Sequence, residues 1–310
     1  MTYIKRRTLL KGAGIITAGT AVMGSGTFLY SSCVEPGWVE VTSTTVHLPR
    51  LDSAFAGYRI VQLSDIHVDE SWMDKGRLEA IVETTNEQKP DLILITGDFV
   101  TQVGANIRDT LSALRGLKAR GGIFGVLGNH DHWSDPVVVR TYLESFGVQE
   151  LNDKIYTLRR GAAMFHLVGV DDLWPNAGDI RPVWEHQGLL ESLLESLPDQ
   201  GAAILLVHEP DFADVAAATG RIDLQLSGHS HGGQIRLPFV GAPVVPPLGQ
   251  KYVDGWYTIK SMQHYTSRGL GMLPPKVRFN CRPEIAVFTC QTGLEVSKRS
   301  LRAVNISKGF

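Results

Sequence analysis

The segment Asp91-Leu-Ile-Leu-Ile-Thr-Gly-Asp98 decides how this chain folds. Its short uninterrupted apolar run is typical of a β-strand that is covered on both faces, and Gly97 and Asp98 follow at its carboxyl end. Apolar residues recur at helical spacing before it, in residues 74–88, and after it, in residues 107–118. A buried strand between two helices predicts parallel strands joined by helical crossovers.

The same pattern extends along the rest of the chain. Strands alternate with helices in the first half, whereas the second half begins with two adjacent strands and ends in short strands interrupted by Pro and Gly. Further strands are expected at 58–63, 122–127, 154–158, 164–170, 202–207, 222–226, 252–259, 263–267 and 283–289, and further helices at 136–146, 184–197 and 212–219. We predict an α/β fold, a four-layer α/β/β/α sandwich of two packed mixed sheets. It should form one domain, residues 46–310, after a linker at residues 34–45.

Side chains that bind metal ions follow the ends of these expected strands. Asp65 and His67 lie two residues apart, as do His229 and His231, so each pair can approach one ion from the same side. Mixed imidazole and carboxylate ligands suit Mn, Fe or Zn better than Ca. The ordered clusters indicate a site for two divalent metal ions with a face open to a phosphate, and they comprise Asp65, His67, Asp98, Asn129, His130, Asp131, His208, His229 and His231.

Three further runs carry a resemblance to a known family: Gly228-His-Ser-His-Gly-Gly-Gln-Ile235, Ser267-Arg-Gly-Leu-Gly271 and Val277-Arg-Phe-Asn-Cys-Arg-Pro-Glu284. With the order of the metal-ligand clusters between residues 58 and 289, the chain resembles the calcineurin-like metallophosphoesterase superfamily. The three runs look like its bacterial YkuE/YaeI-type branch, whose members often carry export signals. The resemblance implies a two-sheet sandwich flanked by helices and a metal-dependent phosphohydrolase activity.

The resemblance also implies a role for each residue of the site. A water or hydroxide held between two ions would attack phosphorus, because a bridging position lowers its pKa and aims it. His130 would contact the phosphate and protonate the leaving oxygen without binding metal. Seven side chains would hold the ions: Asp65, His67 and His231 the first, Asn129, His208 and His229 the second, and Asp98 both.

The sequence departs from two branches of the superfamily just after Asp98. The Ser/Thr protein phosphatases have an Asp-Arg-Gly that begins where this chain has Thr101, and the metal-binding Tyr of the purple acid phosphatases is also missing. The carboxylate that orients the catalytic His in the first group is therefore not at its usual place. We expect Asp131 to point away from the site and His132 to have a supporting or solvent-facing role.

The expected function is that of a phosphodiesterase acting on a small-molecule or lipid-linked phosphodiester. One alternative is a lipid pyrophosphatase of the UDP-2,3-diacylglucosamine type, although that substrate is cytoplasmic and the chain carries an export pattern. A second alternative is a non-catalytic, metal-stabilised binding or scaffold protein, which the presence of His130 with all seven ligands disfavours. The apolar loop Leu237–Leu248 either packs on the sheet or forms a wall that receives an acyl chain or meets a membrane.

The N-terminus has the pattern of an export signal. Residues 1–33 contain Lys5-Arg6-Arg7-Thr8-Leu9-Leu10-Lys11, followed by an uncharged, Gly-rich stretch. The paired arginines resemble a twin-arginine signal, which implies the twin-arginine translocase as a partner and an exported, periplasmic or cell-envelope location. The segment could be cleaved or kept as a membrane anchor. It carries +4 of a net charge of −2, so the acidic remainder argues against binding to nucleic acid.

Overall fold

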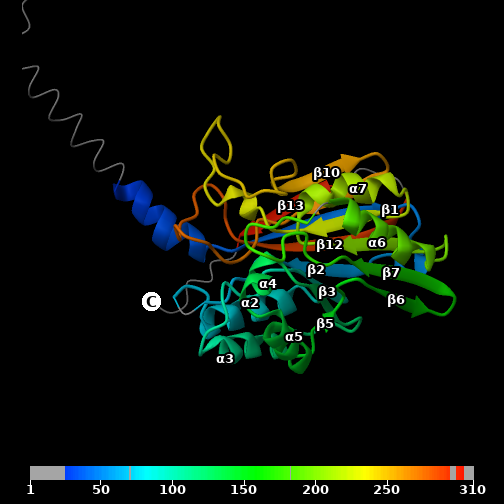
Figure 1. Cartoon of the computed structure of the whole chain (residues 1–310), viewed down its shortest axis with the longest axis horizontal. Helices are drawn as coiled ribbons and strands as arrows, with labels where there is room; N and C mark the ends of the chain where they lie inside the picture. Colours follow the sequence, from blue (N-terminus) through cyan, green and yellow to red (C-terminus); the bar gives the residue numbers. More distant parts are fainter. Residues whose placement is uncertain (1–24, 70, 182, 294–297, 304–310) are drawn as a thin grey trace, which may run out of the picture.

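The computed structural model describes residues 25–69, 71–181, 183–293 and 298–303, and Figure 1 shows their arrangement. In this part of the chain, no helix has the length and apolar character that a membrane crossing needs. Most of the expected export segment lies outside the described residues.

Two mixed sheets form the centre of the molecule. In the first sheet, β2, β3, β4 and β5 run parallel, and β12 joins β2 antiparallel. Its order is β13 (Lys298–Ala303), β1 (Glu40–Leu48), β12 (Glu284–Thr292), β2 (Arg59–Leu63), β3 (Leu92–Thr96), β4 (Ile123–Val126) and β5 (Gln149–Glu150). The second sheet has the order β10 (Gly255–Ile259), β11 (Met262–Thr266), β9 (Leu224–Ser227), β8 (Ala202–Leu206), β7 (Ala163–Gly169) and β6 (Lys154–Arg160).

Helices cover the outer face of each sheet, as Figure 1 shows. The helices beside the first sheet are α2 (Lys75–Glu87), α3 (Ile107–Leu111) with the 3₁₀ turn η4 (Ser112–Gly116), α4 (Asn129–Ser134) and α5 (Pro136–Ser145). Those beside the second sheet are α6 (Val183–Glu195) and α7 (Ala213–Ala218), which follows the 3₁₀ turn η5 (Pro210–Phe212). Two short helical turns, η1 (Tyr30–Val34) and η2 (Glu35–Gly37), precede β1, and two more are η3 (Ser53–Phe55) and η6 (His231–Gly233).

Three apolar cores separate these four layers. Along β3, Ile93 and Ile95 pack among residues of α2 and α3, whereas Leu92 and Leu94 pack among residues of the second sheet. The third core joins the far face of the second sheet to α6 and α7. Because successive side chains of a strand point to opposite faces, a continuous apolar run can serve two cores at once. The predicted four-layer α/β/β/α sandwich is confirmed.

The prediction of a linker at residues 34–45 is wrong, because β1 begins at Glu40 and pairs along its whole length with β12. The segment is polar, and the sequence pattern therefore did not indicate a strand. The structure shows how polar residues fit there: the Thr42 hydroxyl donates to Glu284, and the Thr44 hydroxyl accepts from Trp256. The expected helix at 107–118 is also shorter, because α3 passes into η4 and ends at Gly116.

Candidate metal centre

The seven predicted ligands lie at the carboxyl ends of strands from both sheets. Asp65 and His67 follow β2, Asp98 follows β3 and Asn129 begins the helix after β4. In the second sheet His208 follows β8, and the pair His229 and His231 follows β9. Since parallel strands end at the same edge of a sheet and the two sheets are packed together, residues far apart in the sequence meet there.

The backbone at this edge adopts a conformation that ordinary residues avoid. Positive φ angles occur at Asp65 (49°), His67 (48°), Asp98 (54°), His229 (68°) and His231 (52°). Residues other than Gly rarely take this conformation, which persists where the surrounding structure imposes it and which clusters at functional sites. Five of the seven predicted ligands are held in this way.

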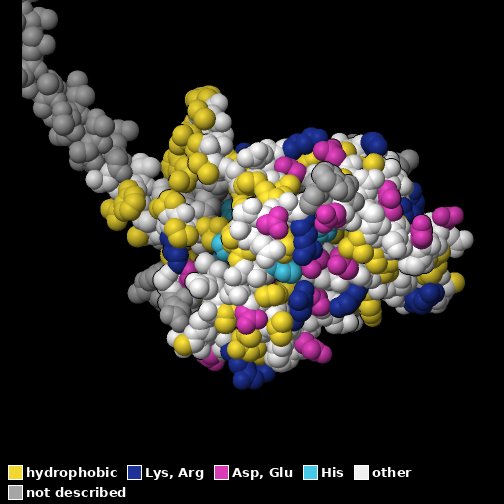
Figure 2. Space-filling model, viewed as in Figure 1, with side chains coloured by type: hydrophobic (Ala, Val, Ile, Leu, Met, Phe, Trp, Pro, Cys, Tyr) yellow, Lys and Arg dark blue, Asp and Glu magenta, His cyan; other side chains and the backbone are white. Residues whose placement is uncertain are grey.

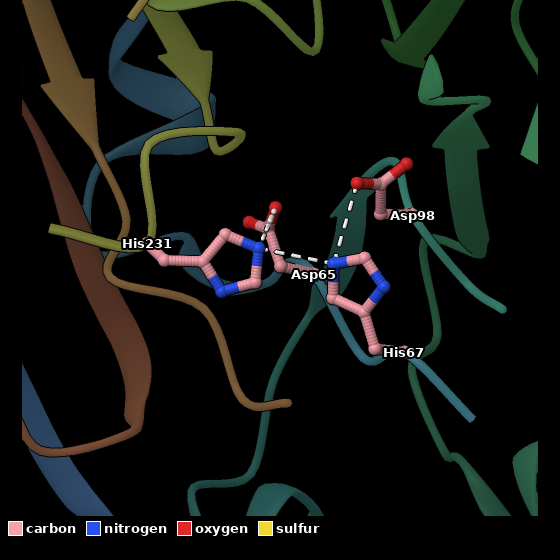
Figure 3. Close-up of side chains that lie close together, drawn as sticks. All are labelled: Asp65, His67, Asp98 and His231. Atoms are coloured by element: carbon pink, nitrogen blue, oxygen red, sulfur yellow. Dashed lines mark hydrogen bonds and ion pairs between the residues drawn. The ribbon is translucent and has the colours of Figure 1, made fainter. Parts of the chain in front are cut away.

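Four side chains form a compact group that could hold one metal ion. Asp65, His67, Asp98 and His231 are buried, and one ligand atom from each lies within 4.8 Å of the others. Figure 3 shows them pointing toward one another, with 3.0 Å between the Nε2 atoms of His67 and His231 and 3.4 Å from His231 Nε2 to Asp65 Oδ1. Two nitrogens that bind one ion at about 2.1 Å and at a right angle lie about 3.0 Å apart, so the spacing fits a shared metal.

Asp98 lies between this group and the remaining ligands. Its Oδ2 atom is 3.3 Å from His67 Nε2 and 3.2 Å from His208 Nε2, while its Oδ1 accepts from the backbone N–H of His130 at 2.9 Å. One carboxylate oxygen thus faces an imidazole of each predicted set. This is the position that a bridging ligand would need.

Histidines of the second set are oriented by backbone carbonyls. The Nδ1 atom of His208 lies 2.7 Å from the Thr96 carbonyl, and the Nε2 atom of His229 lies 2.8 Å from the Pro247 carbonyl. When each ring donates to its carbonyl, the opposite nitrogen is the one that can bind a metal in the neutral form of the ring. That free nitrogen faces Asp98 in His208 and lies 3.0 Å from Asn129 Oδ1 in His229. Both rings therefore have the orientation of metal ligands.

Two glycines permit this close packing. A Cβ atom at Gly97, whose φ is 89°, would lie 2.5 Å from His208 Nδ1. A Cβ atom at Gly128 would lie 2.4 Å from Asp98 Oδ1 and 2.8 Å from His208 Nε2. Real Cβ atoms do not approach so closely, so any larger residue would push the predicted ligands apart.

Burial and the adjacent Asp98 determine which histidines of the site are protonated when no metal is bound. Burial lowers the pKa of His67 to about 3 and also lowers the pKa of His229 and His231, so these rings are neutral at neutral pH. Burial by itself would lower the pKa of His208, but the adjacent Asp98 outweighs burial and raises it well above its usual value. Neutral imidazoles are the form that binds metal, whereas His208 would release a proton on binding.

A cavity of about 460 Å³ opens above the ligands. Polar residues form its floor, among them Asp98, Asn129, His130 and His229. Its walls are mostly apolar: Trp133, Trp174, Ile235, Pro243, Val244, Pro246, Leu273, Pro274 and Pro275. The cavity can therefore admit a polar group to the ligands while its walls contact an apolar one.

Comparison with known proteins identifies the family to which this arrangement belongs. Residues 58–233 match the family described as calcineurin-like phosphoesterase. The chain belongs to this family. It is therefore an enzyme that hydrolyses phosphoric esters, in agreement with the resemblance seen in its motifs.

Individual relatives extend the similarity over nearly the whole chain. The phosphoesterase is 35% identical to the uncharacterized metallophosphoesterase YkuE of Bacillus subtilis, over 94% of this chain and 99% of the relative. It is 33% identical to the phosphodiesterase YaeI of Escherichia coli, over 92% and 98%. A transmembrane protein with a metallophosphoesterase domain from Danio rerio is 31% identical over 90% of this chain and 62% of the relative.

The structure shows what orients His130 in this phosphoesterase. Its Nδ1 atom lies 3.3 Å from the backbone carbonyl of Thr101, and its ring packs against those of His67 and Trp133 at 4.8 and 4.9 Å between centroids. This partner is a backbone carbonyl and not a carboxylate. Sequence analysis missed this partner because every residue has a carbonyl group, so no residue type marks it.

The two neighbours of His130 behave as expected. Asp131 is buried and turned away from the cavity, accepting backbone N–H groups of Phe99, Val100 and Gly128. The Nε2 atom of His132 lies 2.8 Å from Asp171 Oδ1, outside the group of ligands. Both side chains hold α4 in place, and α4 carries Asn129 and His130.

A buried polar network supports Asp65 from behind, and sequence analysis did not predict it. The fully buried guanidinium of Arg278 donates to the carbonyls of Arg268, Gly269, Gly271 and Cys281. The loop that it holds donates from the Gly271 N–H to the Asp65 carbonyl at 2.7 Å. Hydrogen bonds thus join the runs 267–271 and 277–284, two of those that carried the family resemblance, and together they support Asp65.

A second part of this network fixes the same loop to the sheet. Glu284 accepts from Arg268 Nε at 3.2 Å and from the hydroxyls of Tyr265 and Thr42, and Arg268 also pairs with Glu40 at 2.6 Å. Burial alone would raise the pKa of Glu284, but Arg268 and the two hydroxyls lower it to about 2. The carboxylate is therefore charged and fully partnered.

Proposed function

We propose that this enzyme is a metal-dependent phosphodiesterase that uses two divalent metal ions, of Mn, Fe or Zn. The position of Asp98 Oδ2, within 3.3 Å of one imidazole of each predicted ligand set, carries the proposal. A relative of 33% identity is named a phosphodiesterase, which supports the choice of substrate class. The first ion would be held by Asp65, His67 and His231, the second by Asn129, His208 and His229, and both by Asp98.

The donor set fits such a metal pair. The buried Nε2 atom of His208 lies 3.2 Å from Asp98 Oδ2, and the Nε2 atoms of His67 and His231 face each other. Mixed imidazole, carboxylate and amide donors suit these transition metals. When bound, the pair would supply a hydroxide nucleophile and neutralise charge on the phosphoryl oxygens.

The residues around the ligands would perform the rest of the chemistry. Thr101 holds His130 through Nδ1, which leaves the other ring nitrogen free, and in the imidazolium form of His130 that nitrogen would donate its proton to the leaving oxygen. His130 lines the cavity together with Trp133 and Trp174, so the leaving group would lie against aromatic rings. The apolar walls would exclude water other than the nucleophile.

Metal removal tests this function. We expect the full-length enzyme to hydrolyse bis-p-nitrophenyl phosphate, to lose activity with a chelator, and to recover it when Mn²⁺ is added back. Metal analysis of each preparation provides the control. Full activity in a verified metal-free preparation would rule out the two-metal mechanism.

We further propose that the enzyme is exported to the cell envelope by the twin-arginine route. The support is the sequence Lys5–Lys11 with its paired arginines, which lies outside the described residues. The variant Arg6→Lys with Arg7→Lys keeps the charge but removes both guanidinium groups. We expect it to accumulate in the cytoplasm, folded and active. Normal export of the variant in fractionated cells would contradict the proposal.

A further inference from the structure

Exposed apolar side chains gather on one side of the molecule. Among the described residues, ten large hydrophobic side chains are exposed, and seven of them lie in two segments. Figure 2 shows hydrophobic atoms over both, with histidine visible in the hollow beside them. The seven are Phe28, Leu29, Val34, Leu237, Phe239, Val240 and Val244, with Phe239 fully exposed and Val240 70% exposed. The exposed side chains of the loop, from Leu237 to Val244, therefore do not pack on the sheet as one alternative expected, whereas Leu248 packs against the third core.

Both segments rest on the same part of the chain, which fixes their relative position. The backbone N–H of Arg278 donates to the Ser31 carbonyl, and Glu35 accepts from the N–H groups of Asn280 and Cys281. On the other side, Arg236 donates its N–H to the Phe279 carbonyl at 2.8 Å. The N-terminal helix, residues 25–34, and the apolar loop are thus neighbours across residues 278–281.

The backbone of the projecting loop is suited to an apolar medium. Leu237 and Gly241 exchange two hydrogen bonds, at 2.8 and 2.9 Å, and Val240 donates to the Leu237 carbonyl. Four prolines, at 238, 243, 246 and 247, have no N–H group to satisfy. In lipid every backbone donor left without a partner is costly, and the prolines and these hydrogen bonds reduce the number of such donors at the tip.

The charge distribution points to a bilayer as the occupant of this surface. Residues 237–250 contain no charged side chain, and the flanking Arg236 and Lys251 are paired with Asp254 and Asp214. The N-terminal helix belongs to the stretch of residues 12–34, which also contains no charged side chain. An uncharged, proline-rich tip beside an apolar helix is typical of a surface that meets lipid.

The surface is continuous with the cavity above the ligands. Ile235, Val244 and Pro246 belong to the loop or its base and line the cavity wall, whose floor includes His130 and His229. The loop also returns to the ligands, since the Pro247 carbonyl lies 2.8 Å from His229. A molecule whose head lies at the ligands can therefore extend an apolar chain along this wall toward the exposed tip.

We propose that the loop tip and the N-terminal helix dock on a lipid bilayer, and that the substrate is a phosphodiester bearing an acyl chain. Docking would place the mouth of the cavity at the level of the lipid head groups. The choice of substrate rests on the proposed phosphodiesterase function, whereas the docking does not.

Docking can be measured with a fluorescent probe on the full-length chain. Phe239→Cys in a Cys33→Ser background provides one exposed thiol for an environment-sensitive dye, because Cys281 and Cys290 are buried. Val137→Cys is the matched control, since Val137 is also exposed, at 69%, but lies on α5. With phosphatidylcholine vesicles we expect a blue shift at position 239 and none at 137. An unchanged emission at 239, or equal shifts at both positions, would overturn the docking surface.

Hydrolysis tests the substrate class. The double variant Phe239→Ser/Val240→Ser is compared with the single variant Val137→Ser as the control. Each buried apolar side chain that is lost should weaken interfacial binding roughly tenfold. The two substitutions together should therefore lower hydrolysis of a long-chain phosphodiester in vesicles by about a hundredfold, while hydrolysis of bis-p-nitrophenyl phosphate stays at the parent rate. A parent enzyme that hydrolyses bis-p-nitrophenyl phosphate but not the long-chain phosphodiester would refute the acyl substrate. Equal rates on vesicles for both variants would refute a role of the loop tip in reaching it. If the parent hydrolyses neither compound, the proposed function fails, and the fluorescence experiment still decides the docking.

Discussion

The floor and the rim of the cavity differ in how they are held and in what they contact. The floor consists of buried ligands on strand ends, with positive φ angles at Asp65 and Asp98 and carbonyl partners for its histidines. The rim is an exposed loop with an uncharged, proline-rich tip, from Leu237 to Leu248. The difference indicates separate roles for the two regions. The ligands of the floor would act on the bond that is broken, and the loop of the rim would select the molecules that reach them.

Asp98→Asn should cause the largest loss of metal binding and of activity. The amide cannot place a negatively charged oxygen between the ions that His67 and His208 would hold. The binding of both ions should therefore be weakened, and activity should fall toward the uncatalysed rate. Metal content and hydrolysis of bis-p-nitrophenyl phosphate are measured on the same sample. A variant that keeps two ions and most of its activity would show that Asp98 is not the bridge.

His130→Ala should separate chemistry from metal binding. We expect metal content to be retained and the rate to fall by about 10²–10⁴, the range for loss of a general acid. The loss should be smaller for esters with good leaving groups, which need no proton. If the purified variant contains no metal, His130 is a ligand and the proposed roles must be exchanged.

Glu284→Gln should destabilise the fold that supports the floor. Loss of the buried charge leaves Arg268 partly unpaired, which should lower the free energy of unfolding by about 3 kcal/mol at neutral pH. Urea unfolding of metal-free parent and variant measures it, with Glu144→Gln, an exposed residue of α5, as the control.

The pH dependence of this difference has a definite sign. Burial is outweighed by Arg268 and two hydroxyls, so the folded pKa of Glu284 is about 2, below its ordinary value of 4.5. Its contribution is thus complete above pH 4.5 and is lost as the pH falls from 4.5 toward 2. The gap between parent and variant should shrink over that window. A constant gap would mean that the carboxylate charge does not stabilise the fold.

The sequence predicted the fold, and the strand ends at which the proposed ligands lie, because each depends on local patterns. A continuous apolar run such as Leu92–Ile95 can only be a buried segment, and a polar residue directly after it must lie at the sheet edge. The strand β1 was missed because its threonines find partners, Glu284 and Trp256, that are more than 200 residues away in the chain. Such long-range partners leave no periodic signal.

The orientation of His130 lay beyond sequence analysis for a related reason. The search for a carboxylate failed because the acceptor is the Thr101 backbone carbonyl. Likewise, nothing in the local sequence showed that Glu35 and Arg278 would be buried in the support of one loop. Side-chain chemistry can be predicted from residue types, whereas main-chain acceptors become apparent only once the fold places them.

The smallest predicted effect tests whether the floor is indeed held by its main chain. Thr101→Ala removes the hydroxyl, which makes only a 3.4 Å contact with the His67 carbonyl, and keeps the backbone carbonyl that orients His130. We expect kcat to fall by less than about threefold, well below the loss typical when a supporting partner is removed. The pH profile of kcat should also stay unchanged, because the acceptor for His130 Nδ1 is still present. A tenfold loss with a shifted profile would show that the Thr101 side chain, and not its carbonyl, positions the proton donor.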